Sequence, residues 1–353
     1  MSEMTTHERI SRMYEHREAD RVPLFETAWG PTVERWRREG LGDANYFEYF
    51  GLDRIRRFLV DNSPRFPPSV LEETDDHVVF INPWGATMKY LKHDASIAAT
   101  DVTVRTPDDW LKAKERMTPS DDRIPWDYIK ERWPRWREQG AWIVGIGWFG
   151  FDVTHSWFIG TERHLLALAE NPEWCVDMWR TEQDLSLTLL DRMWDAGYQF
   201  DELLWYDDMG YKLSQFFSLK MYRELLKPIH QKAIDWAHAK GIRAYLHSCG
   251  DIRPFIPDLV EMGVDGLNPL EVKAGVDPLA LKRQFGDRLL LHGGFNAVLW
   301  DDVEEMEAAV RENLPVLMEN GGYIFATDHS TPSNVSLEAF KRIVGVVKDV
   351  GRY

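Results

Sequence analysis

The chain has 353 residues, of which 44% are hydrophobic and 28% are charged, so it can bury a large core in one or two α/β domains. Its formal net charge of −16 disfavours nucleic acid and argues against a highly anionic substrate. No apolar run is long enough to cross a membrane, and the polar start has no signal peptide. We therefore expect a cytoplasmic protein that acts on a small molecule and binds neither nucleic acid nor membrane.

Short strand-like runs recur along the chain and mostly alternate with amphipathic helical stretches. These runs lie at residues 22–26, 54–60, 142–148, 202–208, 243–249, 266–270, 289–295 and 323–329. Strands that alternate with helices in this way predict a parallel sheet. Eight of them predict a (β/α)8 TIM barrel, formed by a single domain over residues 1–353.

The segments between these runs add two helices and one insertion. Residues 171–197 have a helical pattern, and so do residues 218–241, where Ser218 is a candidate N-cap and Pro228 should kink or divide the helix. Residues 75–94 instead carry two strand patterns around a Pro-Trp-Gly turn. We expect a β-hairpin there, inserted at about residues 75–95 as a lip or lid over one end of the barrel.

Polar and aromatic residues collect where the predicted strands end. In a TIM barrel the active site lies at the C-terminal ends of the strands, so this distribution predicts a catalytic site there. The residues concerned are Glu26, Trp29, Trp148, Asp207, Asp208, His247, Cys249, Asn268, Glu271, His292, Asp328 and His329.

His247 and Cys249 end the fifth run and are two positions apart. Residues i and i+2 of a strand share a face, with Cα atoms roughly 6.5 Å apart, so both side chains can reach one ion. Imidazole and thiolate suit Zn²⁺, which takes about three protein ligands in a catalytic site, and His329 at the end of the last run offers a third donor. The spacing alone also fits a small buried cysteine beside a structural histidine.

Three longer runs, HSCGDIRPFIPDLVEMGVDGLNPLE, LLLHGGF and GGYIFATDHSTPSNVSLEAFKRIV, resemble the uroporphyrinogen decarboxylase superfamily. They most resemble its zinc-dependent corrinoid methyltransferase branch, and the resemblance is clear from about residue 200 to 350. It implies that His247 and Cys249 are zinc ligands in an H-x-C-G motif. The third ligand of that branch is a cysteine after the eighth strand, where this chain has His329, a replacement that zinc chemistry tolerates.

The same resemblance implies transfer of a methyl group between a methyl-corrinoid, or a small methylated compound, and a thiol-type acceptor. The chain has no D-x-H-x-x-G corrinoid signature, so a corrinoid (cobamide) would have to arrive on a partner protein. The oligomeric state is open, with a homodimer as one alternative.

Two other reactions remain as alternatives. Uroporphyrinogen decarboxylase itself needs no metal, but the arginine motif that grips its substrate is missing after the first run, and Asp61 matches its catalytic aspartate by a single letter only. A metal-dependent lyase or hydrolase on the same barrel would use metal-bound water with Asp207 as the base.

The remaining candidates have less specific roles. Asp207 and Glu271 are candidate catalytic residues: Asp207 could orient a metal-bound histidine, act as a general base or simply cap a turn. Asn268 and His292 are candidate substrate-binding residues. So are the tryptophans at strand ends or in the hairpin, which could hold a flat methoxylated ring or a quaternary ammonium group, although most tryptophans should serve packing. These tryptophans are Trp29, Trp84, Trp148, Trp157 and Trp205; Cys175 is expected to be a core residue.

Overall fold

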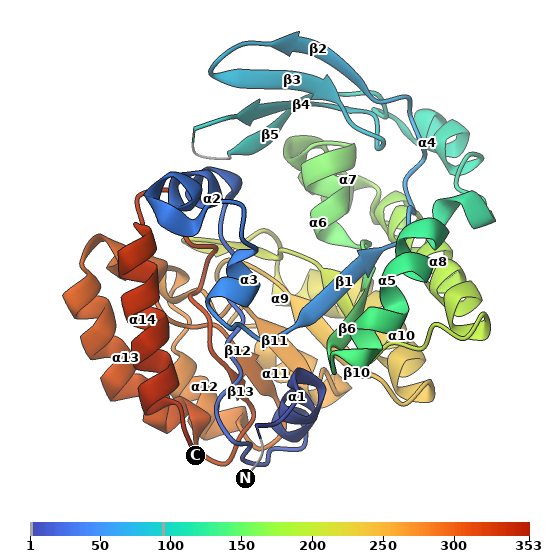
Figure 1. Ribbon diagram of the computed structural model, residues 1–353. Helices are drawn as coiled ribbons and strands as arrows, with labels where there is room; N and C mark the ends of the chain where they lie inside the picture. The colour runs from blue at the N-terminus through green and yellow to red at the C-terminus, as the bar shows by residue number, and fades with distance from the viewer. Residues whose placement is uncertain (1–2, 94–95) are drawn as a thin grey trace. The chain divides into compact units, whose positions relative to one another are not determined.

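A computed structural model describes residues 3–93 and 96–353 (Figure 1). The predicted (β/α)8 class is confirmed: seven parallel strands form one sheet in the order β1-β6-β7-β10-β11-β12-β13, and helices separate most of them along the chain. The strands are β1 (Ile55–Leu59), β6 (Trp142–Gly147), β7 (Glu202–Tyr206), β10 (Arg243–His247), β11 (Gly266–Asn268), β12 (Leu290–His292) and β13 (Tyr323–Ile324). Each of them lies within one of the predicted runs.

The first predicted run, residues 22–26, forms a single parallel bridge between Leu24 and Phe325 instead of a full strand. Phe25 N donates to Phe325 O at 3.1 Å, and Phe325 N donates to Pro23 O at 2.9 Å. Pro23 has no N–H to extend this ladder, so the pairing stays short. The segment nevertheless takes the place of the eighth strand, beside the strand that ends the sheet.

Residue contacts divide the chain into two compact units. The first unit comprises the chain up to Arg56 together with Pro134–Ile143 and Cys249–Tyr353, and the second comprises Arg57–Trp133 and Val144–Ser248. The single-domain organisation stays a prediction, and each unit is described by itself.

In the first unit, β11, β12 and β13 pair in parallel through Leu267, Leu291 and Tyr323. Amphipathic helices bury one apolar face each; in α14, for example, Phe340, Ile343 and Val347 are buried. The helices assigned wholly to this unit are α1 (Thr6–Tyr14), α2 (Gly30–Trp36), α3 (Tyr46–Tyr49), α11 (Ile256–Met262), α12 (Pro278–Phe285), α13 (Val303–Met318) and α14 (Leu337–Val350).

In the second unit, β7 pairs in parallel with both β6 and β10. Both predicted helices are present: α8 begins after the N-cap Asn171, and Ser218 caps the start of the other. Pro228 divides the latter as expected, because α10 starts beside it after a π-helical turn that bypasses its missing N–H. The helices are α4 (Pro107–Lys114), α6 (Phe151–Val153), α7 (Thr161–Glu170), α8 (Pro172–Asp195), α9 (Leu219–Met221) and α10 (Lys227–Ala239); α5 (Trp126–Glu138) continues from this unit into the first.

The predicted hairpin is the central pair of a four-stranded antiparallel sheet in the second unit. It comprises β2 (Ser69–Glu73), β3 (His77–Ile81), β4 (Ala86–Leu91) and β5 (Ile97–Val102). The extent of the insertion was therefore underestimated, because β2 is exposed at every position and has no alternation of apolar and polar residues to reveal it. Residues 94 and 95, at the end of the predicted hairpin, lie outside the described residues.

The described part of the chain has no helix long and apolar enough to cross a membrane.

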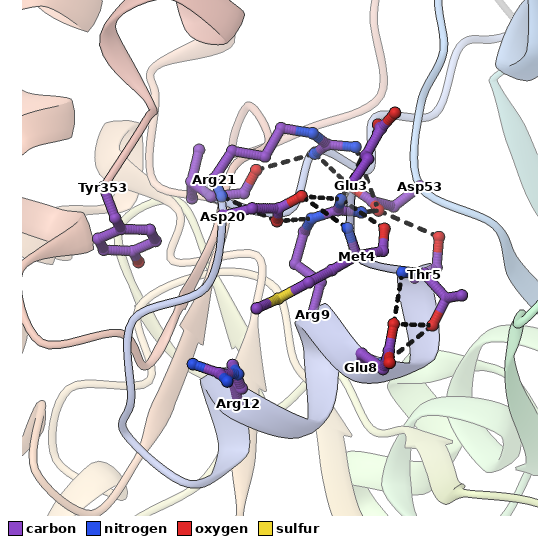
Figure 2. Close-up of polar contacts among 12 residues, drawn as sticks. Glu3, Met4, Thr5, Glu8, Arg9, Arg12, Asp20, Arg21, Asp53 and Tyr353 are labelled. Atoms are coloured by element: carbon purple, nitrogen blue, oxygen red, sulfur yellow. Dashed lines mark hydrogen bonds and ion pairs between the residues drawn. The ribbon is translucent and has the colours of Figure 1, made fainter. Parts of the chain in front are cut away.

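A buried ion network in the first unit joins α1 to the segments that precede the sheet (Figure 2). Asp53 is 1% exposed and accepts hydrogen bonds from Arg9 Nη1 at 2.5 Å, Arg21 Nη1 at 2.7 Å and Leu24 N at 2.8 Å. Arg9 also bonds both carboxylate oxygens of Asp20. One carboxylate therefore fixes a helix, a loop and the first strand segment together.

Replacing Asp53 by alanine should lower the free energy of unfolding by about 3–5 kcal/mol, because it removes one carboxylate partner of the buried Arg9 guanidinium and the acceptor of the buried Leu24 amide. Urea denaturation would measure the loss. Glu224→Ala is the control, since it removes one partner of the exposed Lys220–Glu224 pair and should cost about 0.5 kcal/mol or less. Equal losses in the two variants would contradict the role given to Asp53.

Candidate functional site

Three potential metal ligands meet where β7 and β10 end. The strands pair in register, with Tyr206 opposite His247, so the residues that follow each strand emerge at the same level. His247 Nε2 lies 3.8 Å from Asp208 Oδ1, and the ligand atoms of Asp208, His247 and Cys249 all lie within 4.8 Å of one another. In residues 3–93 and 96–353 this is the one such group of three, and its imidazole, thiol and carboxylate suit zinc.

Asp207, next to Asp208 in the chain, does not belong to this group. Its side chain is fully buried, with Oδ2 2.7 Å from His230 Nε2 and Oδ1 accepting from Asp152 N at 2.8 Å. Its backbone N–H donates to His247 O at 2.9 Å. These contacts favour an orienting role at the two strand ends. His230 was missed by the sequence reasoning, although a histidine among the buried positions of a predicted helix was the available signal.

Asp152 is a second carboxyl group that the sequence did not reveal. Burial raises its pKa well above the usual range, and the nearby Asp208 and Asp207 raise it further. Trp148 Nε1 donates to Asp152 Oδ2 at 3.3 Å, and Ser156 Oγ donates to Oδ1 at 3.0 Å. Asp152 follows β6 closely enough to have been suspected from its place at a strand end.

Glu271 supports the loop that carries Cys249. Its Oε2 accepts from Gly250 N at 2.6 Å, and its Oε1 lies 3.5 Å from Lys273 Nζ. Gly250 has φ 81°, in the left-handed region that favours glycine. Glu271 therefore fixes the turn of the H-x-C-G motif, and its catalytic role stays a prediction.

His329 is not one of the three grouped donors; it lies against Trp29, with ring centroids 5.4 Å apart. Burial lowers its pKa, and Lys273 lowers it further. The structure thus brings Asp208 to the His247–Cys249 pair, whereas His329 as the third ligand stays a prediction.

Asn268 and His292 contact backbone. Asn268 Nδ2 donates to His292 O at 3.2 Å, and His292 Nε2 lies 3.3 Å from Phe25 O. His292 is 4% exposed. Both contacts are of the kind that holds strand ends in place, and substrate binding by the two residues stays a prediction.

The tryptophans divide into core and cavity residues. Trp205 is 0% exposed and stacks on Phe149, with ring centroids 6.2 Å apart. Trp84, Trp148 and Trp157 line a cavity of about 410 Å³ in the second unit. Cys175 is a core residue, as predicted, and burial raises the pKa of its thiol to about 12.

Glu26, at the end of the first strand segment, is 3% exposed. Burial raises its pKa to about 8, even though Thr327 N and Oγ1 both donate to its carboxylate. Near neutral pH the folded protein therefore holds a proton on this carboxyl group.

The family model for uroporphyrinogen decarboxylase (URO-D) matches residues 159–350, more than half of the chain. The chain belongs to the uroporphyrinogen decarboxylase family. The match includes His247 and Cys249, whereas Trp148 and Asp152 precede it.

Two solved structures match the chain over most of its length. A methyltransferase from Methanosarcina mazei superposes with a TM-score of 0.68 at 19% sequence identity, covering 98% of this chain and 99% of that one. A B12-independent methionine synthase from Shewanella sp. W3-18-1 matches with a TM-score of 0.43 at 10% identity, over 96% of this chain and 97% of that one. No curated protein sequence matches. The first similarity supports the (β/α)8 fold.

The raised pKa of Glu26 predicts a pH-dependent stability. The folded pKa of about 8 exceeds the ordinary value of 4.5, so the stabilisation that comes from the neutral carboxyl group is present below pH 4.5 and is lost as the pH rises through 8. Glu26→Gln cannot ionise. Relative to the variant, the wild type should lose up to about 1.4 kcal/mol of unfolding free energy per pH unit in this window. Urea denaturation at pH 5, 6.5 and 8 would measure this, and parallel pH profiles would contradict it.

Proposed function

We propose that the protein is a zinc-dependent methyltransferase. It would move a methyl group between a methyl-corrinoid on a partner protein, or a small methylated compound, and a thiol-type acceptor. The observation that carries the proposal is the group of Asp208, His247 and Cys249 at the ends of two neighbouring strands. The shared fold of the Methanosarcina mazei methyltransferase is compatible with it.

Each residue near the group has a defined part in this proposal. His247 and Cys249 would hold the zinc ion together with Asp208 or His329. Bound zinc lowers the pKa of a coordinated thiol and so provides a nucleophile at neutral pH. Asp207 holds the end of β10 through His247 O and also accepts a hydrogen bond from Asp152 N. The substrate would be a small molecule, and the protein would act in the cytoplasm as a monomer or a homodimer.

The alternative reactions find less support. For the decarboxylase, Asp61 would be the catalytic carboxylate, but its Oδ2 accepts from Arg65 Nε at 2.5 Å and its Oδ1 from Ser63 Oγ at 2.6 Å. For a metal-dependent hydrolase or lyase, Asp207 would be the base, but both of its oxygens are engaged by His230 and Asp152 N. Methyl transfer therefore remains the better supported reaction.

Elemental analysis of untagged, zinc-supplemented protein tests the metal site. We expect about one zinc per chain, lost in His247→Ala and Cys249→Ala because each removes a ligand. Cys175→Ala is the matched control, since it removes the buried core thiol, and it should keep the metal. The zinc contents of Asp208→Asn and His329→Ala are then compared, and the variant that loses the zinc identifies the third ligand. No zinc in the wild type after supplementation would overturn the proposal.

An activity assay tests the reaction with the same variants. The zinc-loaded wild type should transfer a methyl group from methylcobalamin to a thiol, and Cys249→Ala should lose at least about a hundredfold in rate, as expected when a metal that activates the nucleophile is lost. Cys175→Ala should retain the rate. Hydrolysis of a substrate by the zinc-loaded protein without any corrinoid would instead favour the hydrolase.

The contact between Glu271 and Gly250 gives a separate prediction. Glu271→Ala should weaken zinc binding by about 10- to 100-fold, the usual effect of removing a group that orients a metal ligand. Competition with a chelator of known affinity would measure it. Glu338→Ala, an exposed glutamate in the first turn of α14, should leave the affinity unchanged. Unchanged affinity in Glu271→Ala would show that its hydrogen bond does not position Cys249.

A further inference from the structure

The cavity of about 410 Å³ in the second unit has the size of a small-molecule site. It lies at the C-terminal ends of β1 and β6, which contribute residues 59–63 and Trp148. The inserted sheet contributes Phe80 to the lining, and its turn contributes Pro83 and Trp84. Trp157, in the π-helical turn Thr154–Phe158, is the remaining aromatic residue of the lining. The inserted sheet therefore contributes one wall of the cavity.

The three tryptophan rings meet edge to face. The rings of Trp148 and Trp157 are 5.1 Å apart at 66°, and those of Trp84 and Trp148 are 6.4 Å apart at 77°. Trp84 is 4% exposed and backs the wall, whereas Trp148 and Trp157 are partly exposed. Such rings offer faces and edges to another aromatic ring.

Two buried asparagines hold this wall in place. Asn62 Nδ2 donates to Trp148 O at 2.6 Å, and Asn82 Nδ2 donates to Trp157 O at 3.0 Å. Asn82 Oδ1 also accepts from Trp84 N at 3.0 Å. Asn62 and Asn82 are 3% and 2% exposed. Their partners are backbone atoms, so they hold the backbone that carries the tryptophans before any ligand arrives, and a pre-formed site costs less entropy on binding.

The charged groups around the cavity neutralise one another. They are two aspartates and two arginines: Asp61, Asp122, Arg65 and Arg123. Arg65 binds both aspartates at 2.5 Å, and the Arg123 guanidinium donates to four backbone carbonyls. The lining thus has no net charge, and its charged groups are already engaged, so an ionic ligand finds no unpaired counter-charge there.

We propose that this cavity binds a neutral aromatic molecule between Trp148 and Trp157. The inference rests on the proposed function in one respect, namely that the bound ring carries the transferred methyl group as an aryl methyl ether. The O–CH3 bond breaks, an S–CH3 bond forms on the acceptor thiol, and the thiol proton ends on the phenol oxygen. Trp148 links the cavity to the strand end that carries the ligand group, since its Nε1 donates to Asp152 Oδ2 at 3.3 Å and Asp152 N donates to Asp207 Oδ1 at 2.8 Å, one residue before Asp208.

Isothermal titration calorimetry with anisole, benzoate and tetramethylammonium tests the inference in chelator-treated, metal-free protein. Anisole should bind at least about tenfold more tightly than either ion, a difference of about 1.4 kcal/mol. Trp157→Ala should weaken anisole binding at least about tenfold, since it removes a ring contact and its buried area. Trp157→Phe should restore most of the affinity. Asn82→Ala should weaken anisole binding, because it removes the hydrogen bonds to Trp157 O and Trp84 N.

Trp194→Ala is the control, because Trp194 lies in α8 of the same unit and packs on Phe200 outside the cavity lining. It should bind anisole as the wild type does. Tighter binding of either ion, no binding of anisole, or equal affinity in Trp157→Ala would overturn the inference. Anisole binding that depends on Trp157 in a protein that never takes up zinc would refute the methyltransferase and keep the cavity assignment. Zinc uptake without anisole binding would refute the cavity assignment and leave the methyltransferase proposal standing.

Discussion

The in-register parallel pairing of β7 and β10 is the constraint on which the candidate site depends. Because Tyr206 lies opposite His247, the residues after both strands leave the sheet at one level. Asp208 can then approach His247, while Cys249 follows two positions later. A shift of one residue in this pairing would turn every side chain of one strand to the other face, and the three ligand atoms would no longer meet.

Buried polar groups hold the strand ends in place. In the second unit, Asp207 N donates to His247 O and so joins the ends of β7 and β10, and the Asp207 carboxylate binds His230. In the first unit, the Asp53 carboxylate accepts hydrogen bonds from Arg9, Arg21 and Leu24 N. Both carboxylates are almost fully buried, so their partners must be supplied by the fold. In each unit, these contacts tie segments that are separate in the sequence to one another.

The candidate metal-ligand group and the aromatic cavity are two chemically different features of the chain. The family match over residues 159–350 includes His247 and Cys249, but Phe80, Trp84, Trp148 and Trp157 all precede it. The inserted sheet contributes Phe80 to the cavity, and its turn contributes Trp84. Trp148 Nε1 donates to Asp152, and Asp152 N donates to Asp207, so hydrogen bonds connect the tryptophan wall to the end of β7.

The sequence by itself determined the strand pattern, the helix caps and the His247–Cys249 pair, because periodicity and capping are local properties of the chain. It could not show the outer strands of the inserted sheet, since β2 is exposed throughout and has no apolar period. Nor could it show that Asp208 approaches His247, that His230 binds Asp207, or that two asparagines hold the tryptophan wall. These contacts join residues between 23 and 86 positions apart, and only the tertiary structure decides which distant side chains share a buried space.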